Sequence, residues 1–479
     1  MSHILNDVSR RSFLGASAAL GAALPVAAAD RSGAVASPEP AVVKKLYLAR
    51  PSAGWPRPDI DWEAEIRQID AQLAGLEARY PGCVRFTGGE FLRNEPDTAA
   101  WAAAATDADI VLAFNLSTGV YPMLKKLVDA DLPVTLFSLP YMGHDWTHAA
   151  AFQQMGKKME VIASSAFSDL EPCLPLFQTV RHLKKSKVLL MSPAARHPKA
   201  DGYTRQFGTA FAFPDYLELK ALYEAEDIPR AEGAARTFTQ AALRVVEPSG
   251  QEITDSLRLY HAIQKLMARE QANAIAIDCL GGFGRKDLPA YPCVAFSKLN
   301  DAGLYGVCEC DLESTMTQLL ITSFSRVPGF VSDPVFDTSR NEVIHAHCVA
   351  ATRLAGLERA PSPYLIRSHL EDYKGVAMEV LPPASGVVTV ARFADARRML
   401  ISTGEVIGNV DDPNGCRTKI RTRVTDARKF LHGYAAARTG DGKMPGTRDL
   451  LHRVVFYGDY LRETEALGRL LGFEVIHEV

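Results

Sequence analysis

The fold class of the first half of the chain follows from one stretch, Ile110-Val-Leu-Ala-Phe114, then Tyr121–Ala130, then Val134-Thr-Leu-Phe-Ser138. Each of the two short apolar runs is typical of a buried strand, and the segment between them has the apolar spacing of an amphipathic helix. Parallel strands need a crossover connection, which is usually a helix. The stretch therefore predicts a βαβ unit in a doubly wound, Rossmann-like α/β domain.

The same alternation extends in both directions. Upstream lie a strand-like run at Lys45–Ala49, a helical segment at Trp62–Tyr80 and a further strand at Val84–Phe86. Downstream, a second series consists of a strand at Lys187–Met191, a helix at Asp255–Gln271 and a strand at Ala274–Asp278. We expect two Rossmann-like doubly wound domains, at residues 43–180 and 181–355.

The last third of the chain has a different pattern. Short strand-like runs occur at Val376–Val380, Gly386–Ala391, Leu400–Val406 and Arg453–Tyr457. Turn sequences separate them, and the one long helical segment is the closing one at Tyr460–Leu471. Strands without intervening helices favour an antiparallel arrangement, so residues 356–479 are predicted to form a β-rich, barrel-like domain with a closing helix.

The N-terminus has the features of an export signal. Ser9-Arg10-Arg11-Ser12-Phe13-Leu14-Gly15 is a twin-arginine pattern, and it is followed by the weakly apolar run Ala16–Leu24 and by Ala27-Ala28-Ala29. The apolar run is too short for a permanent anchor, and three small residues are typical of a cleavage site. The sequence therefore predicts a signal peptide at 1–29, a linker at 30–42, the twin-arginine translocase as a partner during export, and a periplasmic location.

Composition indicates a large soluble globular protein. The 479 residues are 47% hydrophobic and 23% charged, and 53 basic against 56 acidic residues give a net charge of −3. This balance gives no excess of basic residues of the kind that binds nucleic acid. No apolar run of about 18 residues follows the signal, so no transmembrane segment is expected. Eight cysteines in so long a chain do not make a dense disulfide framework, and the sequence does not determine their pairing.

The stretch from Asp278 to Cys348 carries the residues with the most chemistry. Glu309 and Asp333 each follow a short strand-like run, and His345 and His347 come soon afterwards. Carboxylates and imidazoles that converge at strand ends can form a divalent metal site or an acid/base pair. The alternative is that such acids only cap helices, as Asp311 could do for the helical run that follows it.

Several separated motifs of this stretch and of the C-terminal region occur together in one known family. They are Asp278-Cys279-Leu280, Pro292-Cys293, Leu299-Asn300-Asp301-x-Gly303, Cys308-Glu309-x-Asp311, Asp333, His347-Cys348, Ser368-His369, Gly386-x-x-Thr389, Asn414–Thr418, His452 and Tyr457–Tyr460. From about Asn273 to Val479 the chain resembles the L-fucose/L-arabinose isomerase-like family. The resemblance implies two Rossmann-like domains and a β-rich domain around a cleft.

The resemblance also implies a function and a site. It implies that Glu309, Asp333 and His452 hold Mn²⁺ or Mg²⁺, while the two carboxylates act as acid and base through an ene-diol. The expected activity is aldose–ketose isomerisation of a small sugar, and relatives assemble as homo-oligomers. Hard oxygen ligands with one imidazole suit these cations.

Other residues could complete this site. His347 is either an additional ligand or a residue that orients a carboxylate by a hydrogen bond. Asp337 competes with Asp333 for the ligand role, and motif position favours Asp333. His369 and Arg417 could line the cleft and contact sugar hydroxyls.

Three alternatives remain open at the level of sequence. A structural zinc site could draw on soft ligands from Cys308, Cys310, His345, His347 and Cys348. The same fold could serve another metal-assisted reaction on a sugar or glycoside, as an epimerase, a lyase or a glycoside hydrolase, because fold does not fix function. Two Rossmann-like lobes exported to the periplasm could also form a non-catalytic sugar-binding protein.

Overall fold

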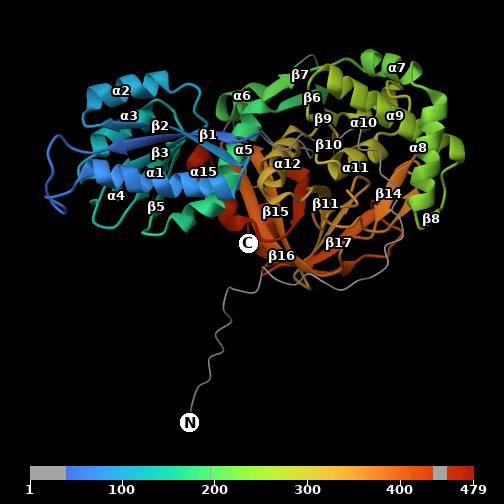
Figure 1. Ribbon diagram of the computed structural model, residues 1–479. Coiled ribbons are helices and arrows are strands. Elements are labelled where there is room, and N and C mark those ends of the chain that lie inside the picture. The colour runs from blue at the N-terminus through green and yellow to red at the C-terminus, as the bar shows by residue number, and fades with distance from the viewer. Residues whose placement is uncertain (1–38, 195, 435–449) are drawn as a thin grey trace, which may run out of the picture. The chain divides into compact units, whose positions relative to one another are not determined.

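The computed structural model describes residues 39–194, 196–434 and 450–479 (Figure 1). The predicted signal peptide at 1–29 and most of the predicted linker lie outside the described residues. Within the described ranges, no helix combines the length and the apolar character needed to cross a membrane.

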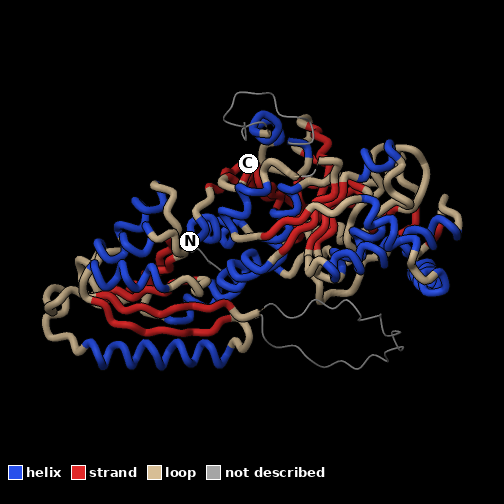
Figure 2. The backbone as a smooth tube through the Cα atoms, turned by 90° about the horizontal axis from the view of Figure 1, so that it is seen from above, coloured by secondary structure: helices blue, strands red, loops and turns tan. Residues whose placement is uncertain are grey.

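The first sheet is fully parallel and has the strand order β2-β1-β3-β4-β5. Its strands are β1 Ala41–Leu48, β2 Val84–Leu92, β3 Ile110–Asn115, β4 Val134–Ser138 and β5 Met159–Ala163. They are connected by α1 Trp62–Arg79, α2 Glu95–Ala104, α3 Tyr121–Asp129 and α4 Thr147–Gln154. Every residue of β3 and β4 is buried, and helices lie on both sides of the sheet (Figure 2). The predicted doubly wound fold is thus confirmed, and β1 begins inside the range 30–42 predicted as a linker.

The second sheet is also parallel, in the order β10-β9-β6-β7. Its strands are β6 Lys187–Met191, β7 Ala210–Ala212, β9 Ala274–Ile277 and β10 Tyr305–Cys308. The helices of this region are η1 Phe167–Cys173, α5 Leu174–Lys185, α6 Ala200–Phe207, α7 Tyr216–Glu224, α8 Ile228–Ala241, α9 Gly250–Arg269, α10 Cys279–Arg285, α11 Cys293–Asp301 and α12 Leu312–Ser325. Helix α9 begins earlier than predicted because Ser249 and Glu252 form a capping box.

The C-terminal region contains a closed six-stranded antiparallel barrel. Its order is β15-β18-β11-β12-β17-β16, and the pairing of β15 with β16 closes it. The strands are β11 Phe330–Asp337, β12 Glu342–His347, β15 Gly386–Asp395, β16 Arg398–Asn409, β17 Thr418–Arg423 and β18 Arg453–Tyr457. Closure leaves no unpaired edge among them. The β-rich prediction is confirmed, and β11 and β12 come from the range 181–355.

Further elements complete the barrel region. Strand β19 Glu474–His477 pairs in parallel with β16, and the helices are α13 Ala427–Gly433 and α15 Leu461–Leu471. A small separate sheet has the order β14-β13-β8, with β8 Arg244–Val245, β13 Tyr364–Arg367 and β14 Ala377–Val380. The predicted strand Val376–Val380 therefore exists but lies outside the barrel.

Helix α12 joins the second sheet to the barrel. All its residues from Leu312 to Thr322 are buried. Its Met316 belongs to one hydrophobic core with Val188 of β6 and Phe393 of β15. A helix buried all round must pack against partners on several sides. This packing fixes the residues just before α12, Glu309 to Asp311, at the junction of sheet and barrel.

Candidate metal centre

Glu309 occupies a sharp turn between β10 and α12. Both Glu309 and Cys310 have left-handed backbone conformations, with φ of 58° and 52°. Such a conformation costs about 1–3 kcal/mol for each residue other than glycine, and it persists where the surrounding structure enforces it. Asp311 then begins α12 and accepts a hydrogen bond from the Ser314 amide at 3.0 Å. The turn ends the strand so that the Glu309 side chain can face the barrel.

The barrel supplies three further side chains of the candidate site, those of Asp333, His347 and His452. Asp333 lies within β11, opposite Ala346 of β12, whose last residue is His347. Strand β11 also pairs with β18, with Ser332 opposite Arg453. Continuing this register by one residue places Asp333 opposite His452, directly before β18. The prediction that Asp333 follows a strand was wrong, because β11 continues through it to Asp337.

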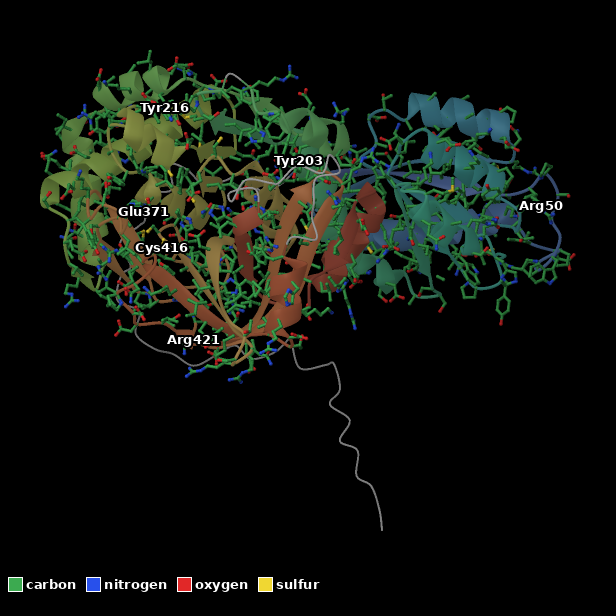
Figure 3. The ribbon with its side chains drawn as sticks, turned by 180° about the vertical axis from the view of Figure 1, so that it is seen from behind. Arg50, Tyr203, Tyr216, Glu371, Cys416 and Arg421 are labelled. Carbon is green, nitrogen blue, oxygen red and sulfur yellow. The ribbon has the colours of Figure 1, made fainter. Side chains whose placement is uncertain are left out.

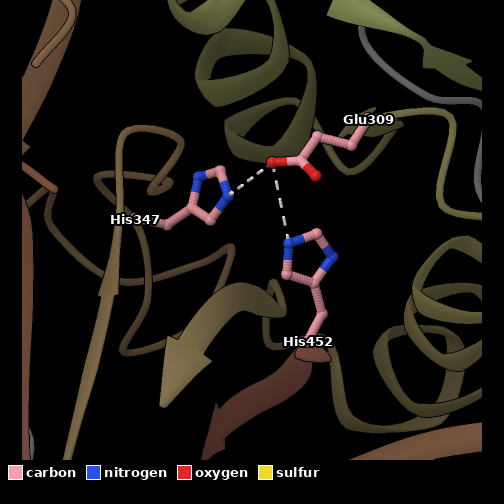
Figure 4. Close-up of side chains that lie close together, drawn as sticks. All are labelled: Glu309, His347 and His452. Atoms are coloured by element: carbon pink, nitrogen blue, oxygen red, sulfur yellow. Dashed lines mark ion pairs between the residues drawn. The ribbon is translucent and has the colours of Figure 1, made fainter. Parts of the chain in front are cut away.

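The side chains converge at short distances. One ligand atom each of Glu309, His347 and His452 lies within 4.8 Å of the others. Figure 4 shows both imidazoles directed at one carboxylate oxygen of Glu309, with Nε2–Oε1 distances of 3.9 Å for His347 and 3.8 Å for His452. Asp333 is 3.3 Å from Nε2 of His452 and 3.9 Å from Nε2 of His347. The structure therefore brings together Glu309, Asp333, His452 and His347.

His452 is held by a buried carboxylate. Its Nδ1 lies 2.7 Å from Oδ2 of Asp311, which also accepts from Arg392 Nη1 at 2.6 Å. Burial lowers the pKa of His452, but the neighbouring carboxylates of Asp311 and Asp333 outweigh it and raise the pKa to about 9. Burial would raise the pKa of Asp311, yet Arg392 and His452 hold it well below its usual range. Asp311 therefore stays ionised and holds a proton on Nδ1, so Nε2 is the atom that can bind a metal ion once its own proton is displaced.

His347 has a different environment. Its Nδ1 accepts a hydrogen bond from the Cys348 amide at 2.9 Å, and burial lowers the pKa of the ring. A neutral ring whose Nδ1 accepts must carry its proton on Nε2, which faces Glu309 and Asp333. Of the two roles left open by the sequence, this arrangement favours orientation of the carboxylates.

The residues present fit a hard divalent cation. Burial raises the pKa of Asp333, but His452 and His347 outweigh it and lower the pKa below its usual value, so this carboxylate is ionised at neutral pH. Asp333 Oδ1 and His452 Nε2 are buried and face each other at 3.3 Å, but neither makes a hydrogen bond of good geometry. Buried polar atoms normally make such bonds, and atoms that do not often mark the position of a water molecule or an ion. Glu309, His347 and His452, with Asp333 beside them, are thus the residues that could hold a metal ion.

Two acidic or imidazole candidates lie away from this cluster. The carboxylate of Asp337 accepts hydrogen bonds from Ser339 at the far end of β11. His345 is fully buried, and its two ring nitrogens lie 3.2 Å from the Ser332 hydroxyl and 3.1 Å from the Thr422 hydroxyl. With both nitrogens engaged, His345 has no free ligand atom.

His369 and Arg417 belong to a neighbouring segment. Arg417 donates from Nε to the Ser368 carbonyl at 2.8 Å and from Nη2 to the Ser368 hydroxyl at 2.9 Å. The buried His369 ring packs against Tyr291 with ring centroids 5.4 Å apart. Arg417 therefore holds the segment that carries His369, and a contact of either residue with a sugar stays a prediction.

The zinc alternative is not assembled in the described part of the chain. There the one group of three or more converging His, Cys, Asp or Glu ligand atoms is Glu309, His347 and His452. Cys308 lies 3.5 Å from Nε2 of His347, but Cys310 packs in the hydrophobic core. Because the strand ends at Cys308, the two thiols do not share one face as strand alternation would require.

Sequence reasoning missed two residues of the site. Asp311 was interpreted only as a helix cap, although it lies two residues after the candidate ligand Glu309. Arg392 is 1% exposed within β15. An arginine inside an otherwise apolar strand was the available signal, because buried arginines are rare unless paired.

The chain has a partial similarity to a known enzyme. No protein-family model matches the chain. A sulfoquinovose isomerase from Clostridium sp. (strain MSTE9) is 26% identical to it over 226 residues, which are 46% of this chain and 47% of that protein. The match thus spans about half the length of each protein. Over that half, the chain is similar to a sugar isomerase.

Proposed function

We propose that this protein is a divalent-metal-dependent aldose–ketose isomerase that acts on a small sugar. The observation that carries the proposal is the convergence of Glu309 with His347 and His452, with Asp333 3.3 Å from His452. The similarity to a sulfoquinovose isomerase supports an aldose–ketose isomerase over an epimerase, a lyase, a glycoside hydrolase or a binding protein.

The reaction needs proton transfers that two carboxylates can perform. An aldose–ketose isomerase moves one proton between adjacent carbons and another between their oxygens. Glu309 and Asp333 would act as the base and acid for these transfers, with His347 orienting them through its Nε2 proton. A bound Mn²⁺ or Mg²⁺ would supply polarisation of the carbonyl and stabilisation of negative charge on the sugar oxygens.

Substrate and location form part of the proposal. Sulfoquinovose is the first sugar to examine, because the similar protein is a sulfoquinovose isomerase. Export to the periplasm by the twin-arginine route is supported by Arg10 and Arg11 and by the small residues Ala27 to Ala29. Assembly as a homo-oligomer is supported by the family resemblance alone.

The test combines metal analysis with turnover. The full chain is purified, treated with chelator, and reloaded with Mn²⁺ or Mg²⁺ before a screen of aldoses that includes sulfoquinovose. We expect ketose formation that requires the metal, and Glu309→Gln should keep the fold while losing turnover and most metal affinity. Glu342→Gln is the matched control, because Glu342 lies at the opposite end of β12 from His347 and pairs with Arg421.

Two results would contradict the proposal. Undiminished turnover in the chelator-treated protein would remove the metal from the mechanism. Wild-type turnover by Glu309→Gln would remove Glu309 from the site.

A further inference from the structure

Two cysteines lie next to each other at the barrel end that carries the candidate metal centre. Strand β12 ends at His347, which pairs with Thr418, the first residue of β17. Cys348 follows His347 directly, and Cys416 precedes Thr418 by two residues (Cys416 is labelled in Figure 3). Continued by one residue, this register places Cys348 opposite Arg417, the neighbour of Cys416. The ladder therefore brings the two chain segments that carry the cysteines side by side.

The side chains are in contact as well. Cys348 is 1% exposed and packs with Cys293 and Ala377, and the half-buried Cys416 packs against this group. The Cys416 thiol donates a hydrogen bond to the Cys348 sulfur. Cys348 is therefore the enclosed member of the pair, and Cys416 is the member that a reagent can reach.

Further hydrogen bonds converge on the sulfur of Cys348. The backbone amides of Arg417 and Leu370 both donate to it, in addition to the thiol of Cys416. Donors arranged in this way stabilise a sulfur that carries negative charge, and such a sulfur is the attacking species in disulfide exchange. The surroundings of Cys348 thus suit a nucleophile, whereas a cysteine that only fills space needs no such donors.

We propose that Cys348 and Cys416 are a reversible redox pair that forms a disulfide by exchange with a low-molecular-weight disulfide such as oxidised glutathione. The Cys416 thiol passes its proton along its hydrogen bond to the Cys348 sulfur, and the resulting Cys416 thiolate attacks the reagent, which breaks the reagent's S–S bond and releases one thiolate. The sulfur of Cys348 then attacks the mixed disulfide on Cys416 and releases the second. The two protein thiols are oxidised, the reagent disulfide is reduced to two thiols, and the two cysteine protons pass to them.

The chain offers a matched control for exposure. Cys173 is also half-buried, but its thiol lies 3.9 Å from the Asp169 carbonyl instead of beside a second thiol. The comparison of Cys416 with Cys173 therefore separates the effect of a thiol partner from the effect of exposure.

The experiment uses the wild-type full chain with its metal as purified. The protein is equilibrated in buffers of graded reduced and oxidised glutathione, free thiols are trapped by alkylation, and peptides are mapped by mass spectrometry. We expect one cross-link, between the peptides that contain Cys348 and Cys416, which dithiothreitol reverses. The Cys173→Ser variant should give the same titration, and Cys416→Ser should leave Cys348 as a free thiol at every ratio.

The proposal does not depend on the folding of either variant, because the wild-type map decides it. A Cys416 that carries only a glutathione adduct, while Cys348 stays free at the most oxidising ratio, would overturn it. A cross-link from Cys416 to a cysteine other than Cys348 would also overturn it. Neither result depends on isomerase activity, so failure here is distinct from failure of the proposed function.

Discussion

Asp311 contacts Nδ1 of His452 at 2.7 Å, although the two residues are 141 positions apart in the chain. Asp311 is the N-cap of α12, so the same carboxylate that begins a buried helix also orients an imidazole of the candidate metal centre. A carboxylate behind a ligating histidine fixes its tautomer and raises its basicity. The helix and the site are therefore coupled through one side chain.

Replacement of Asp311 by asparagine should weaken metal binding by about 10–100-fold, the usual effect of removing a residue that orients a ligand. The amide can still cap α12, but it no longer holds the proton of His452 on Nδ1. Titration of the metal-free protein with Mn²⁺ measures the change. Asp426→Asn is the control, because Asp426 caps α13 by accepting from the Lys429 amide at 2.8 Å. Equal affinities of the two variants would show that Asp311 only caps its helix.

The two histidines of the cluster should respond differently to substitution. His452→Gln should abolish stoichiometric metal binding, because Nε2 of His452 is the imidazole atom left free for a ligand. His347→Gln should retain the metal and lose turnover, because Nδ1 of His347 accepts from the Cys348 amide and its Nε2 proton faces the carboxylates. Elemental analysis of both purified variants distinguishes the roles. Loss of metal from both would make His347 a ligand.

The choice between two aspartates on β11 can be tested in one pair of variants. Asp333→Asn should lower Mn²⁺ affinity and turnover, because its carboxylate lies 3.3 Å from Nε2 of His452. Asp337→Asn should change neither, because Asp337 is bound by Ser339 and Arg340 outside the cluster. A larger effect at Asp337 in the Mn²⁺ titration would reverse the assignment.

Acid should destabilise the protein in part through His182. The ring of His182 lies 3.0 Å from the Tyr305 hydroxyl, and burial lowers its pKa from 6.5 to about 4. The folded state therefore favours the neutral ring, and between these two values the unfolded chain binds a proton that the folded chain does not. The stability that depends on this ring is complete above pH 6.5 and is lost as the pH falls towards 4.

Removal of the ring tests this linkage. His182→Gln should reduce the dependence of unfolding free energy on pH by about 1.4 kcal/mol per pH unit inside that window. Urea unfolding at a series of pH values gives the slope for each variant. The same slope in both proteins would mean that His182 titrates normally in the folded state.

Arg453 and Glu478 should contribute strongly to stability. Their side chains are each 1% exposed and joined by hydrogen bonds of 3.0 Å and 2.7 Å. Arg453→Met leaves the buried carboxylate of Glu478 without its charged partner, so the unfolding free energy should fall by about 3–5 kcal/mol. Arg196→Met breaks an exposed pair with Asp201 and should lower the unfolding free energy far less, because solvent screens that pair. Urea denaturation compares them, and equal losses would contradict the argument.

Much of the fold is predictable because its strands are short apolar runs. The predicted strands Val134–Ser138 and Arg453–Tyr457 coincide with β4 and β18. The sequence did not reveal the extent of β11, because Asp333 and Pro334 interrupt its apolar pattern. Pairing with β12 keeps these residues in the strand, with Asp333 opposite Ala346 and Pro334 opposite His345, and such pairing is a tertiary effect that local pattern does not encode.

The residues of the candidate site were likewise predictable only in part. Motif position singled out Glu309, Asp333 and His452, and the structure brings their side chains close together. The Asp311–His452 contact was not predictable, because it depends on how α12 packs against the barrel. Local sequence likewise could not decide whether His347 is a ligand or orients a carboxylate. That depends on the hydrogen bond from the Cys348 amide to Nδ1 of His347, which requires one particular orientation of the ring.

The candidate metal centre joins two separately built layers of the protein. Glu309 comes from the turn after β10 of a parallel sheet, whereas Asp333 and His452 come from the barrel. A site built from both layers exists only in the folded chain. A ligand that binds only the folded state adds about 2.7 kcal/mol to the unfolding free energy when its concentration is a hundred times its Kd. The melting temperature of this protein should therefore rise with the concentration of free divalent metal in solution.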